Sequence, residues 1–547
     1  MPSTPPPPLK ELAPHYIRIE EGDRKAMLTD LGLDRLDDVF SHIDDSLQFS
    51  KAPDIGPELS YREVMNTMEE IASQNCPRPS FIGDGLKSYS IPGICAKVAE
   101  IRGLSTAYTP YQPERSQGTL MSLWIYASAL SKLTGLEAVN ASLYDRATCL
   151  FEAIATAKRM GQGEGPALIC GPLYPGDREV LTTLAQETSL SFVFLPHDGR
   201  TGRCGPKAFE KLLIQEKPFA VVFSQVNALG ILEDVDVLTD LTHKAKALAL
   251  ALIDPVHLCS RGLKPPSEFG QEGADIIVAE GQHLCLAPNF GGPGLGVFGM
   301  RFPGRQKGAI RSAPGRLVGE GKDRRGRPCK SIVLSTREQH IRREKATSNI
   351  CSNQSFVATM AGAALLAKGD EGLNDSLTLS RTRALEAFER LGRLEGLSPT
   401  YPESPFWNEW VLDLGRDCDE VIEKARLQGL HLGVNVSKRV GDGRNHHLMV
   451  FFNDIQTQED MTAFFQFFET HFDSSPSERS GHSGPKAWPI PKNLLRKGSV
   501  ELPRYGEEKL LDYYQKLGEQ NVSPDQAVYP LGSCTMKYNP LLNDYAA

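Results

Sequence analysis

The chain has 547 residues, of which 40% are hydrophobic and 23% are charged, and its formal net charge is −8. These values are typical of a soluble globular protein that is long enough to bury a sizeable core and to form several domains. The acidic balance gives no general reason to expect binding to nucleic acid or to an anionic membrane. The 11 cysteines are scattered without a CxxC pair, so we expect free thiols.

The N-terminal stretch MPSTPPPP has neither a basic region nor an apolar segment, so it does not resemble a secretion signal. The longest aliphatic run, residues 247–253, is too short to cross a bilayer. We therefore expect a cytoplasmic protein. Residues 1–14 contain six prolines and predict a disordered tail. Residues 15–80 predict an N-terminal helical arm, because their first part places apolar residues at three- and four-residue steps.

Helices and strands are predicted to alternate in the next part of the chain, within a large domain of residues 81–330. The predicted helices are residues 118–135, 144–160, 177–187 and 236–248, and the predicted strands are 167–170, 190–195, 219–224, 250–254 and 274–279. The strand segments are short apolar runs, as in buried parallel strands. This alternation predicts an α/β fold with a mainly parallel sheet and helices on both faces. Residues 301–330 are basic and glycine-rich and predict an exposed excursion.

A smaller α+β domain is predicted over residues 331–472. Its helices are expected at residues 354–368, 380–391 and 458–468, and its strands at 406–414, 432–436 and 447–452. His446 and His447 are adjacent on a predicted strand, so their side chains point to opposite faces and no metal site is expected. Residues 473–485 have the composition of a linker. Residues 486–547 form a separate segment, which we do not expect to form a core alone.

The stretch GADIIVAEGQHLCLAPNFGGPGLG, residues 273–296, is the most informative part of the chain. A predicted strand is followed by a polar turn with His283 and by a glycine-rich loop. In enzymes that use pyridoxal phosphate, a strand, a turn lysine and such a loop often occur in this order, and the lysine forms the Schiff base. This turn has no lysine, and the nearest are Lys264 and Lys307. His283 could titrate near neutral pH, but it cannot form an aldimine with the cofactor. Alternatively, His283 is a partly buried, hydrogen-bonded side chain without a role in chemistry.

Three further groups of residues are candidates for a binding site. Asp254 ends a predicted strand, where a carboxylate can hold the pyridinium nitrogen of pyridoxal phosphate protonated, or can simply cap the next turn. A polar and aromatic group precedes a predicted helix and could also be a packed loop. A basic group could meet a phosphate or an acidic partner, or could be a solvated helix face. The polar group is Tyr108, Thr109, Tyr111 and Gln112, and the basic group is Arg337, Arg342, Arg343 and Lys345, beside Thr347, Ser348 and Asn349.

Four stretches together resemble the P-protein of the glycine cleavage system, glycine dehydrogenase (decarboxylating), and in particular its first subunit. They are TPYQPERSQG (109–118), NASLYD (140–145), GADIIVAEGQ (273–282) and TREQHIRREKATSNICSN (336–353). The resemblance runs from about residue 15 to about residue 472. It implies a large domain like that of type I pyridoxal phosphate enzymes and a smaller C-terminal domain. In residues 486–547, the motif YPLGSCTMKYNP resembles the opening of the catalytic second subunit.

In that family the second subunit carries the cofactor lysine, and His283 falls at the corresponding position here. The resemblance therefore implies that subunit 2, as a partner, holds the pyridoxal phosphate and that this chain has no catalytic residue of its own. The family decarboxylates glycine and passes the aminomethyl group to the lipoyl arm of the H-protein. The resemblance also implies that a set of residues of this chain lines the partner's site. These residues are Tyr108, Thr109, Tyr111, Gln112, Thr347, Ser348 and Asn349.

Two positions depart from the first-subunit pattern. Arg146 replaces a glycine of the relatives, and FIGDGLKSYSIP (81–92) lacks the histidine–tyrosine pair that usually precedes its IP. Two alternatives therefore stay open: a non-catalytic scaffold or regulatory paralogue, and a stand-alone pyridoxal phosphate enzyme that uses another lysine. We also expect residues 486–547 to dock away from residues 301–472 and to reach toward the partner, with Ser533, Cys534 and Lys537 near the partner's cofactor pocket.

Overall fold

The computed structural model describes residues 20–49, 51, 54, 56–57, 59–107, 109–161, 163–302, 304–333, 338–348, 354–472 and 486–523. The chain divides into two compact units, Met1–Pro77 with Asn539–Ala547, and Arg78–Tyr538. The first unit contains helices α2 (Glu21–Asp30) and α3 (Tyr61–Ser73) and the 3-10 helices η2 (Leu36–Phe40) and η3 (Asp45–Leu47). None of these four elements has a buried residue. Among the described residues, no helix is long and apolar enough to cross a membrane.

A seven-stranded sheet forms the centre of the second unit, in the order β1-β7-β6-β5-β4-β2-β3. Strands β2 to β6 are parallel, whereas β7 is antiparallel to β6 and β1 is antiparallel to β7. The predicted mainly parallel sheet is therefore confirmed. The strands are β1 (Ala138–Val139), β2 (Ala167–Cys170), β3 (Phe192–Leu195), β4 (Ala220–Ser224), β5 (Leu248–Ile253), β6 (Ile276–Glu280) and β7 (Gly296–Met300).

Helices cover both faces of this sheet. Successive side chains of a strand point to opposite faces, so each face packs against its own layer of helices. Val221 packs with the helices of one face and Val222 with those of the other. The first face is covered by α6 (Gln117–Thr134), α9 (Pro206–Glu216), α10 (Val235–Lys244) and α12 (Ser355–Leu391), and the second by α7 (Arg146–Arg159) and α8 (Pro175–Ala185). Gly135 ends α6 in the left-handed conformation with φ 71°, which glycine adopts readily.

The smaller α+β domain is also confirmed, and α12 leads into it. The two helices predicted at residues 354–368 and 380–391 are one long helix with a kink at Gly369, whose φ is 57°. The domain has a four-stranded sheet in the order β10-β11-β13-β12. Its elements are β10 (Ser398–Pro399), β11 (Glu409–Asp413), α13 (Cys418–Leu427), β12 (Val434–Asn435), α14 (Ser437–Val440), β13 (His447–Phe451) and α15 (Gln458–Phe472). Among the described residues, no group of histidine, cysteine or carboxylate side chains could hold a metal ion.

The stretch predicted as an exposed excursion contains a hairpin of β8 (Leu317–Lys322) and β9 (Pro328–Val333). Its half-buried strands were missed because basic residues and glycines interrupt the alternation of apolar side chains. The 3-10 helix η9 (Gly304–Ser312) precedes the hairpin, and α11 (Gln339–Arg342) and η10 (Arg343–Lys345) follow it. Arg342, Arg343 and Lys345 are exposed. Arg337 lies outside the described residues.

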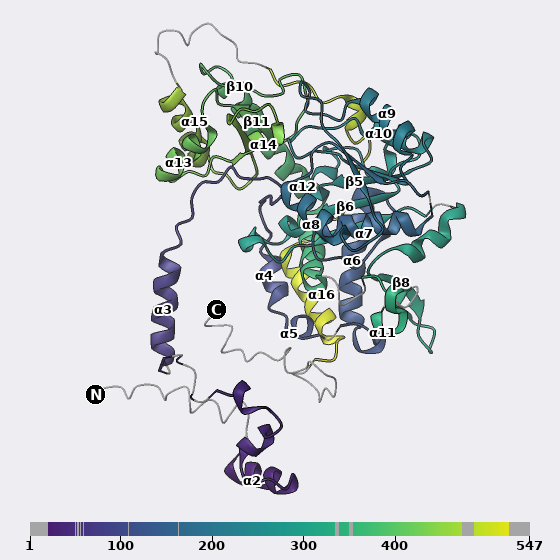
Figure 1. Cartoon of the computed structure of the whole chain (residues 1–547), viewed down its shortest axis with the longest axis vertical. Helices are drawn as coiled ribbons and strands as arrows, with labels where there is room; N and C mark the ends of the chain where they lie inside the picture. Colours follow the sequence, from purple (N-terminus) through teal and green to yellow (C-terminus); the bar gives the residue numbers. More distant parts are fainter. Residues whose placement is uncertain are drawn as a thin grey trace. The chain divides into compact units, whose positions relative to one another are not determined.

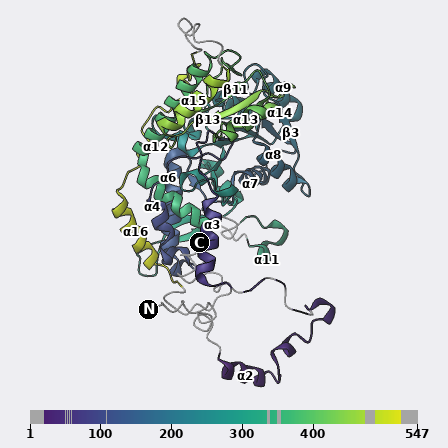
Figure 2. The same cartoon turned by 90° about the vertical axis from the view of Figure 1, so that its left-hand side faces the viewer.

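Residues 486–523 pack against their own chain, so the expectation that this segment docks away from residues 301–472 is wrong for its described part. Backbone N–H groups of Asp370 and Tyr505 donate to the carbonyl oxygens of Leu502 and Leu366, which ties the segment to α12. Its helix α16 (Glu507–Glu519) lies beside α6, α4 (Ile94–Ala99) and α5 (Arg102–Ser105) (Figures 1 and 2). The amphipathic α16 buries its apolar side on the nearest apolar surface, which belongs to this chain. The predicted positions of Ser533, Cys534 and Lys537 fall outside the described residues.

Candidate active site

The turn after β6 is held by the carboxylate of Glu280, the last residue of that strand. Its Oε1 accepts hydrogen bonds from the backbone N–H groups of Gly281 at 3.1 Å, Gln282 at 2.9 Å and Leu295 at 2.7 Å. Its Oε2 accepts a fourth from the N–H of Arg146 at 3.2 Å. One buried carboxylate therefore joins the turn, the start of β7 and the start of α7, and fixes the position of the 3-10 helix η7 (Gln282–Leu284) that carries His283.

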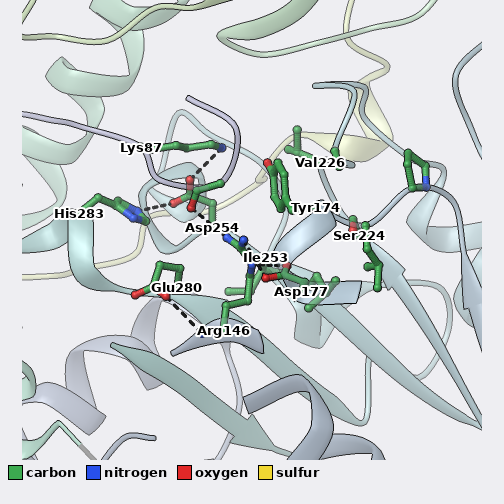
Figure 3. Close-up of a pocket in the computed structure, with 15 residues that line it drawn as sticks. Lys87, Arg146, Tyr174, Asp177, Ser224, Val226, Ile253, Asp254, Glu280 and His283 are labelled. Carbon is green, nitrogen blue, oxygen red and sulfur yellow. Dashed lines mark hydrogen bonds and ion pairs between the residues drawn. The ribbon is translucent and has the colours of Figure 1, made fainter. Parts of the chain in front are cut away.

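His283 and Lys87 both contact the carboxylate of Asp254, which follows β5 (Figure 3). The Nε2 of His283 lies 3.0 Å from Oδ1, and the Nζ of Lys87 lies 3.2 Å from Oδ2. All three side chains are largely buried, with exposed fractions of 4%, 7% and 11% for His283, Lys87 and Asp254. Asp254 also accepts the backbone N–H of Val256 at 3.0 Å and so caps the 3-10 helix η5 (Pro255–Leu258). Both oxygens of this carboxylate are therefore engaged within the chain.

The charges around Asp254 favour its ionised form. Burial alone would raise the pKa of Asp254, but His283, Lys87 and the more distant His257 lower this pKa well below its ordinary value. Burial lowers the pKa of His257 to about 4. The fully buried His257 is therefore neutral at neutral pH, and its Nε2 lies 3.3 Å from the side-chain oxygen of Asn408. The largely buried carboxylate of Asp254 is thus contacted by one lysine and one histidine.

Arg146 and Asp177 form a second, largely buried ion pair beside the first (Figure 3). The Nε and Nη2 atoms of Arg146 donate to the two carboxylate oxygens of Asp177, at 2.7 and 3.1 Å. Its Nη1 donates to the carbonyl oxygen of Gly85 at 3.1 Å, and the guanidinium lies 4.5 Å from the ring centre of Tyr174. Burial alone would lower the pKa of Arg146, but Asp177 raises it above its ordinary value. The guanidinium is thus held from three sides.

Little empty space remains between these side chains. The cavity that Lys87, Arg146, Tyr174, Asp254 and His283 line has a volume of about 40 Å³. Sites for small molecules and cofactors usually measure about 300–1,000 Å³. The cavity is therefore far smaller than a site that holds a ring-sized cofactor.

The structure brings two of the sequence-predicted site residues together, Asp254 and His283. None of the other described candidates lines the cavity beside them. Thr109, Tyr111 and Gln112 lie just before α6, where the last two are exposed. Ser348 is fixed by its hydroxyl, which donates to Glu152 of α7, and by its carbonyl oxygen, which accepts the N–H of Gly315; its neighbour Thr347 is half-buried. Tyr108 and Asn349 lie outside the described residues.

Sequence reasoning missed the groups that complete the site, Lys87, Asp177 and Glu280, and the part that Arg146 plays in it. Arg146 was noted only as a departure from the relatives. The departures in residues 81–92 and at position 146 were the available signal, because both now prove to supply cations to this cavity. No spacing rule could have paired Lys87 with Asp254, since the two are 167 positions apart.

Residues 14–468 match the family described as glycine cleavage system P-protein. The chain belongs to the P-protein family. Two relatives are both named probable glycine dehydrogenase (decarboxylating) subunit 1. That of Nitrosomonas europaea is 36% identical and is matched over 82% of this chain and 97% of its own length. That of Chlorobaculum tepidum is 34% identical, over 82% and 98%. Within the P-protein family, this chain is of the subunit 1 type of that oxidoreductase, as the sequence resemblance implied.

The fold agrees with this membership. The crystal structure of a glycine decarboxylase (P-protein) of the glycine cleavage system, in inhibitor-bound form, has a TM-score of 0.74 and 33% identity, and the match covers 86% of this chain and 100% of that one. A NifS-like protein with 13% identity has a TM-score of 0.52 and shares the fold alone. The predicted type I fold of pyridoxal phosphate enzymes is confirmed for this P-protein chain.

The residues of this P-protein chain do not fit pyridoxal phosphate. The turn after β6 offers His283 and no lysine, and the cavity of about 40 Å³ has no room for the ring. Lys87 does not replace the missing lysine. A ring between the carboxylate that holds its nitrogen and the lysine that holds its aldehyde would keep these two groups apart, whereas Lys87 lies 3.2 Å from Asp254. Lys264 is bound to Asp236 at 2.6 Å and lies outside the lining of the cavity.

Proposed function

We propose that this chain is the subunit of glycine decarboxylase that does not hold the cofactor. It pairs with a lysine-bearing subunit 2, which holds pyridoxal phosphate and decarboxylates glycine, and the aminomethyl product passes to the lipoyl H-protein. The observation that carries this proposal is the contact of His283 and Lys87 with the two oxygens of Asp254. In pyridoxal phosphate enzymes a carboxylate at this place binds the pyridinium nitrogen. Here both oxygens of that carboxylate are already bound by side chains of the same chain.

The contribution of this chain is then structural and positional. Its type I fold presents an exposed polar edge before α6, with Tyr111 and Gln112, as one wall of the partner's site. Tyr108, Thr109, Thr347, Ser348 and Asn349 complete the proposed set. Of these, Ser348 acts through position alone, since its hydroxyl is bound to Glu152.

Co-expression with subunit 2 tests the proposal. The glycine–bicarbonate exchange activity of each chain alone and of the co-purified pair is measured, and borohydride reduction maps the cofactor to one lysine. We expect exchange from the pair, none from this chain alone, and trapping on subunit 2 only. Trapping on a lysine of this chain would instead support a stand-alone pyridoxal phosphate enzyme. A stable pair without any gain in exchange activity would support a regulatory paralogue.

A further inference from the structure

The C-terminal arm, residues 486–523, completes the core of the large domain. Its six most buried apolar residues are at most 5% exposed, and all belong to the core that lies on the α6 face of the central sheet. They are Leu494, Val500, Leu502, Leu510, Tyr514 and Leu517. Leu510, Tyr514 and Leu517 recur at helical spacing on one side of α16. The arm is therefore an integral layer of this domain, although a 13-residue linker segment, residues 473–485, separates it from the rest of the chain.

The arm-binding surface, which consists of α4, α5, the start of α6, residues 257–264 and the first half of α12, receives the arm through backbone hydrogen bonds. The N–H of Lys264 donates to the carbonyl oxygen of Leu494 at 2.9 Å, and the N–H of Arg496 donates to that of Gly262 at 3.0 Å. At the other end of the arm, the N–H of Val522 donates to the carbonyl oxygen of Arg115 at 3.0 Å. Backbone hydrogen bonds of this kind do not depend on side chains, so any segment with the same backbone path could form them.

Two glycines on the arm-binding surface leave room for the arm backbone. A Cβ atom on Gly118 would lie 1.8 Å from the carbonyl oxygen of Leu517, and one on Gly103 would lie 2.5 Å from that of Gly518. The three nearest atoms to either Cβ all belong to the arm. A methyl group at position 118 or 103 would therefore exclude an arm without a close clash elsewhere.

The side chain of Asn521 adds sequence specificity to this contact. Its Oδ1 accepts the backbone N–H of Thr119 at 3.1 Å, and its Nδ2 donates to the carbonyl oxygen of Gly103 at 2.9 Å and to the hydroxyl of Thr119 at 3.0 Å. Asn521 is 3% exposed, so a side chain that lacked these groups would leave buried polar atoms unsatisfied. The arm-binding surface thus selects for asparagine after a helix with apolar residues at this spacing.

The arm lies outside the part of the chain that makes it a first subunit. The family match ends at residue 468, so the arm lies beyond the residues that this match covers. The sequence of residues 486–547 resembles the opening of the catalytic subunit. A segment of catalytic-subunit character thus occupies a shaped receptor on a first-subunit fold.

We infer that the arm-binding surface is the receptor for the opening segment of the catalytic partner, and that this chain's own arm occupies it in cis. This inference rests on the proposed function. The two arms exclude each other, because Gly118 and Gly103 leave room for one backbone only. The covalent link gives this chain's own arm an effective concentration on the order of millimolar, which a free partner must exceed. The arm therefore sets which form of the partner can dock.

The test measures the affinity of the full-length chain for a full-length catalytic subunit and for one without its opening segment. Leu517→Asp places a charge at a site that is 3% exposed and releases the arm, while the arm-binding surface stays intact. We expect this variant to bind the full-length partner at least ten-fold more tightly than the unaltered chain does. No gain is expected with the shortened partner, or when Gly118→Ala is added to close the surface.

The outcomes separate the two proposals. Equal affinities in all four combinations of the two chains and two partners, or a gain that does not depend on the partner's opening segment, would overturn the receptor assignment and leave the proposed function standing. Absence of any complex with either partner, for the unaltered chain and for the arm-released variant alike, would overturn the proposed function. Circular dichroism of Leu517→Asp shows whether the rest of the domain stays folded. If it does not, Asn521→Ala, which removes only the bonds to Thr119 and Gly103, replaces it and must show the same pattern.

Discussion

Arg146 and Asp177 form a two-point ion pair, with Nε 2.7 Å and Nη2 3.1 Å from the two carboxylate oxygens, beside the cavity that also contains Asp254. Asp177 is buried and the Arg146 side chain is 16% exposed, so removing Arg146 would leave a buried carboxylate without compensation. The carboxylate of Asp177 neutralises the guanidinium of Arg146 within the chain. The charge of Arg146 therefore needs no bound anion to balance it.

Arg146→Met is expected to lower the free energy of unfolding by about 3–5 kcal/mol, because it leaves Asp177 buried and unpaired. Arg146→Met with Asp177→Leu is expected to recover most of this loss. Urea denaturation measures both variants. Arg426→Met, which breaks the exposed pair with Glu423, is the matched control and should leave the midpoint nearly unchanged. A double variant no more stable than the single variant would show that Arg146 stabilises by packing alone.

His283→Lys is not expected to create a cofactor site. The new amine would face Asp254 in a cavity of about 40 Å³, where no ring fits. The purified variant, incubated with pyridoxal phosphate, should show no aldimine absorbance and no borohydride-stable adduct on residue 283. The lysine-bearing subunit 2 provides the positive control. An adduct on residue 283 would mean that the side chains around Asp254 rearrange to open the site.

The stability of the chain should depend on pH through His257. The pKa of His257 is about 4 in the folded chain, against an ordinary value of 6.5. Between these two values the unfolded chain binds a proton that the folded chain does not, so the free energy of unfolding falls as the pH falls from 6.5 to 4. This contribution reaches up to about 3 kcal/mol. Comparison of His257→Gln with the unaltered chain at several pH values isolates it, and parallel curves would contradict it.

Glu233 should give the free energy of unfolding the opposite dependence on pH. Burial raises its pKa from 4.5 to about 7, although Asn227 and the N–H of Cys204 donate to its carboxylate. Between pH 4.5 and 7 the unfolded chain loses a proton that the folded chain keeps, so the free energy of unfolding falls as the pH rises through this range. Glu233→Gln should remove up to about 3 kcal/mol of this loss and be most stabilising above pH 7. Equal effects of the substitution at pH 4 and pH 8 would refute this.

Gln112→Ala tests the proposed wall of the partner's site. Gln112 is exposed, so we expect the stability of the isolated chain to stay the same. Loss of one neutral hydrogen bond to the partner or its substrate should lower the exchange activity of the pair by up to about ten-fold. Gln215→Ala, at an exposed position of α9, is the matched control and should leave the activity unchanged. Equal activities of the two variants would remove Gln112 from the proposed set.

The central strands could be predicted from sequence because each is a short apolar run that is buried on both faces. β2 is predicted with its observed bounds, and β4, β5 and β6 within two residues at either end. Shorter or less regular elements were missed. β1 has only two residues, and α9, which begins at Pro206, is absent from the predicted helices. At the kink of α12, Gly369 lies close to Arg504, which is 135 positions later in the chain.

The candidate site could be predicted only in part. Asp254 and His283 follow neighbouring parallel strands, so topology alone brings them to one edge of the sheet. Their compensation by Lys87 depends on the fold of residues 81–92 over that edge, which has no local signal. The path of the arm was predicted wrongly because its resemblance to another subunit said nothing about which apolar surface of this chain lies within reach.

Thr119 of α6 and Asn521 of the arm are hydrogen-bonded, although they are 402 positions apart. A ribosome adds roughly 5–20 residues per second, so the arm leaves the exit tunnel roughly 20–80 s after α6. During that interval of each round of synthesis, the nascent chain presents the receptor around Gly103 and Gly118 without its own arm. A partner translated nearby meets an open surface, whereas a partner that arrives after release meets a closed one. The order in which the segments are made can therefore decide which arm is captured first.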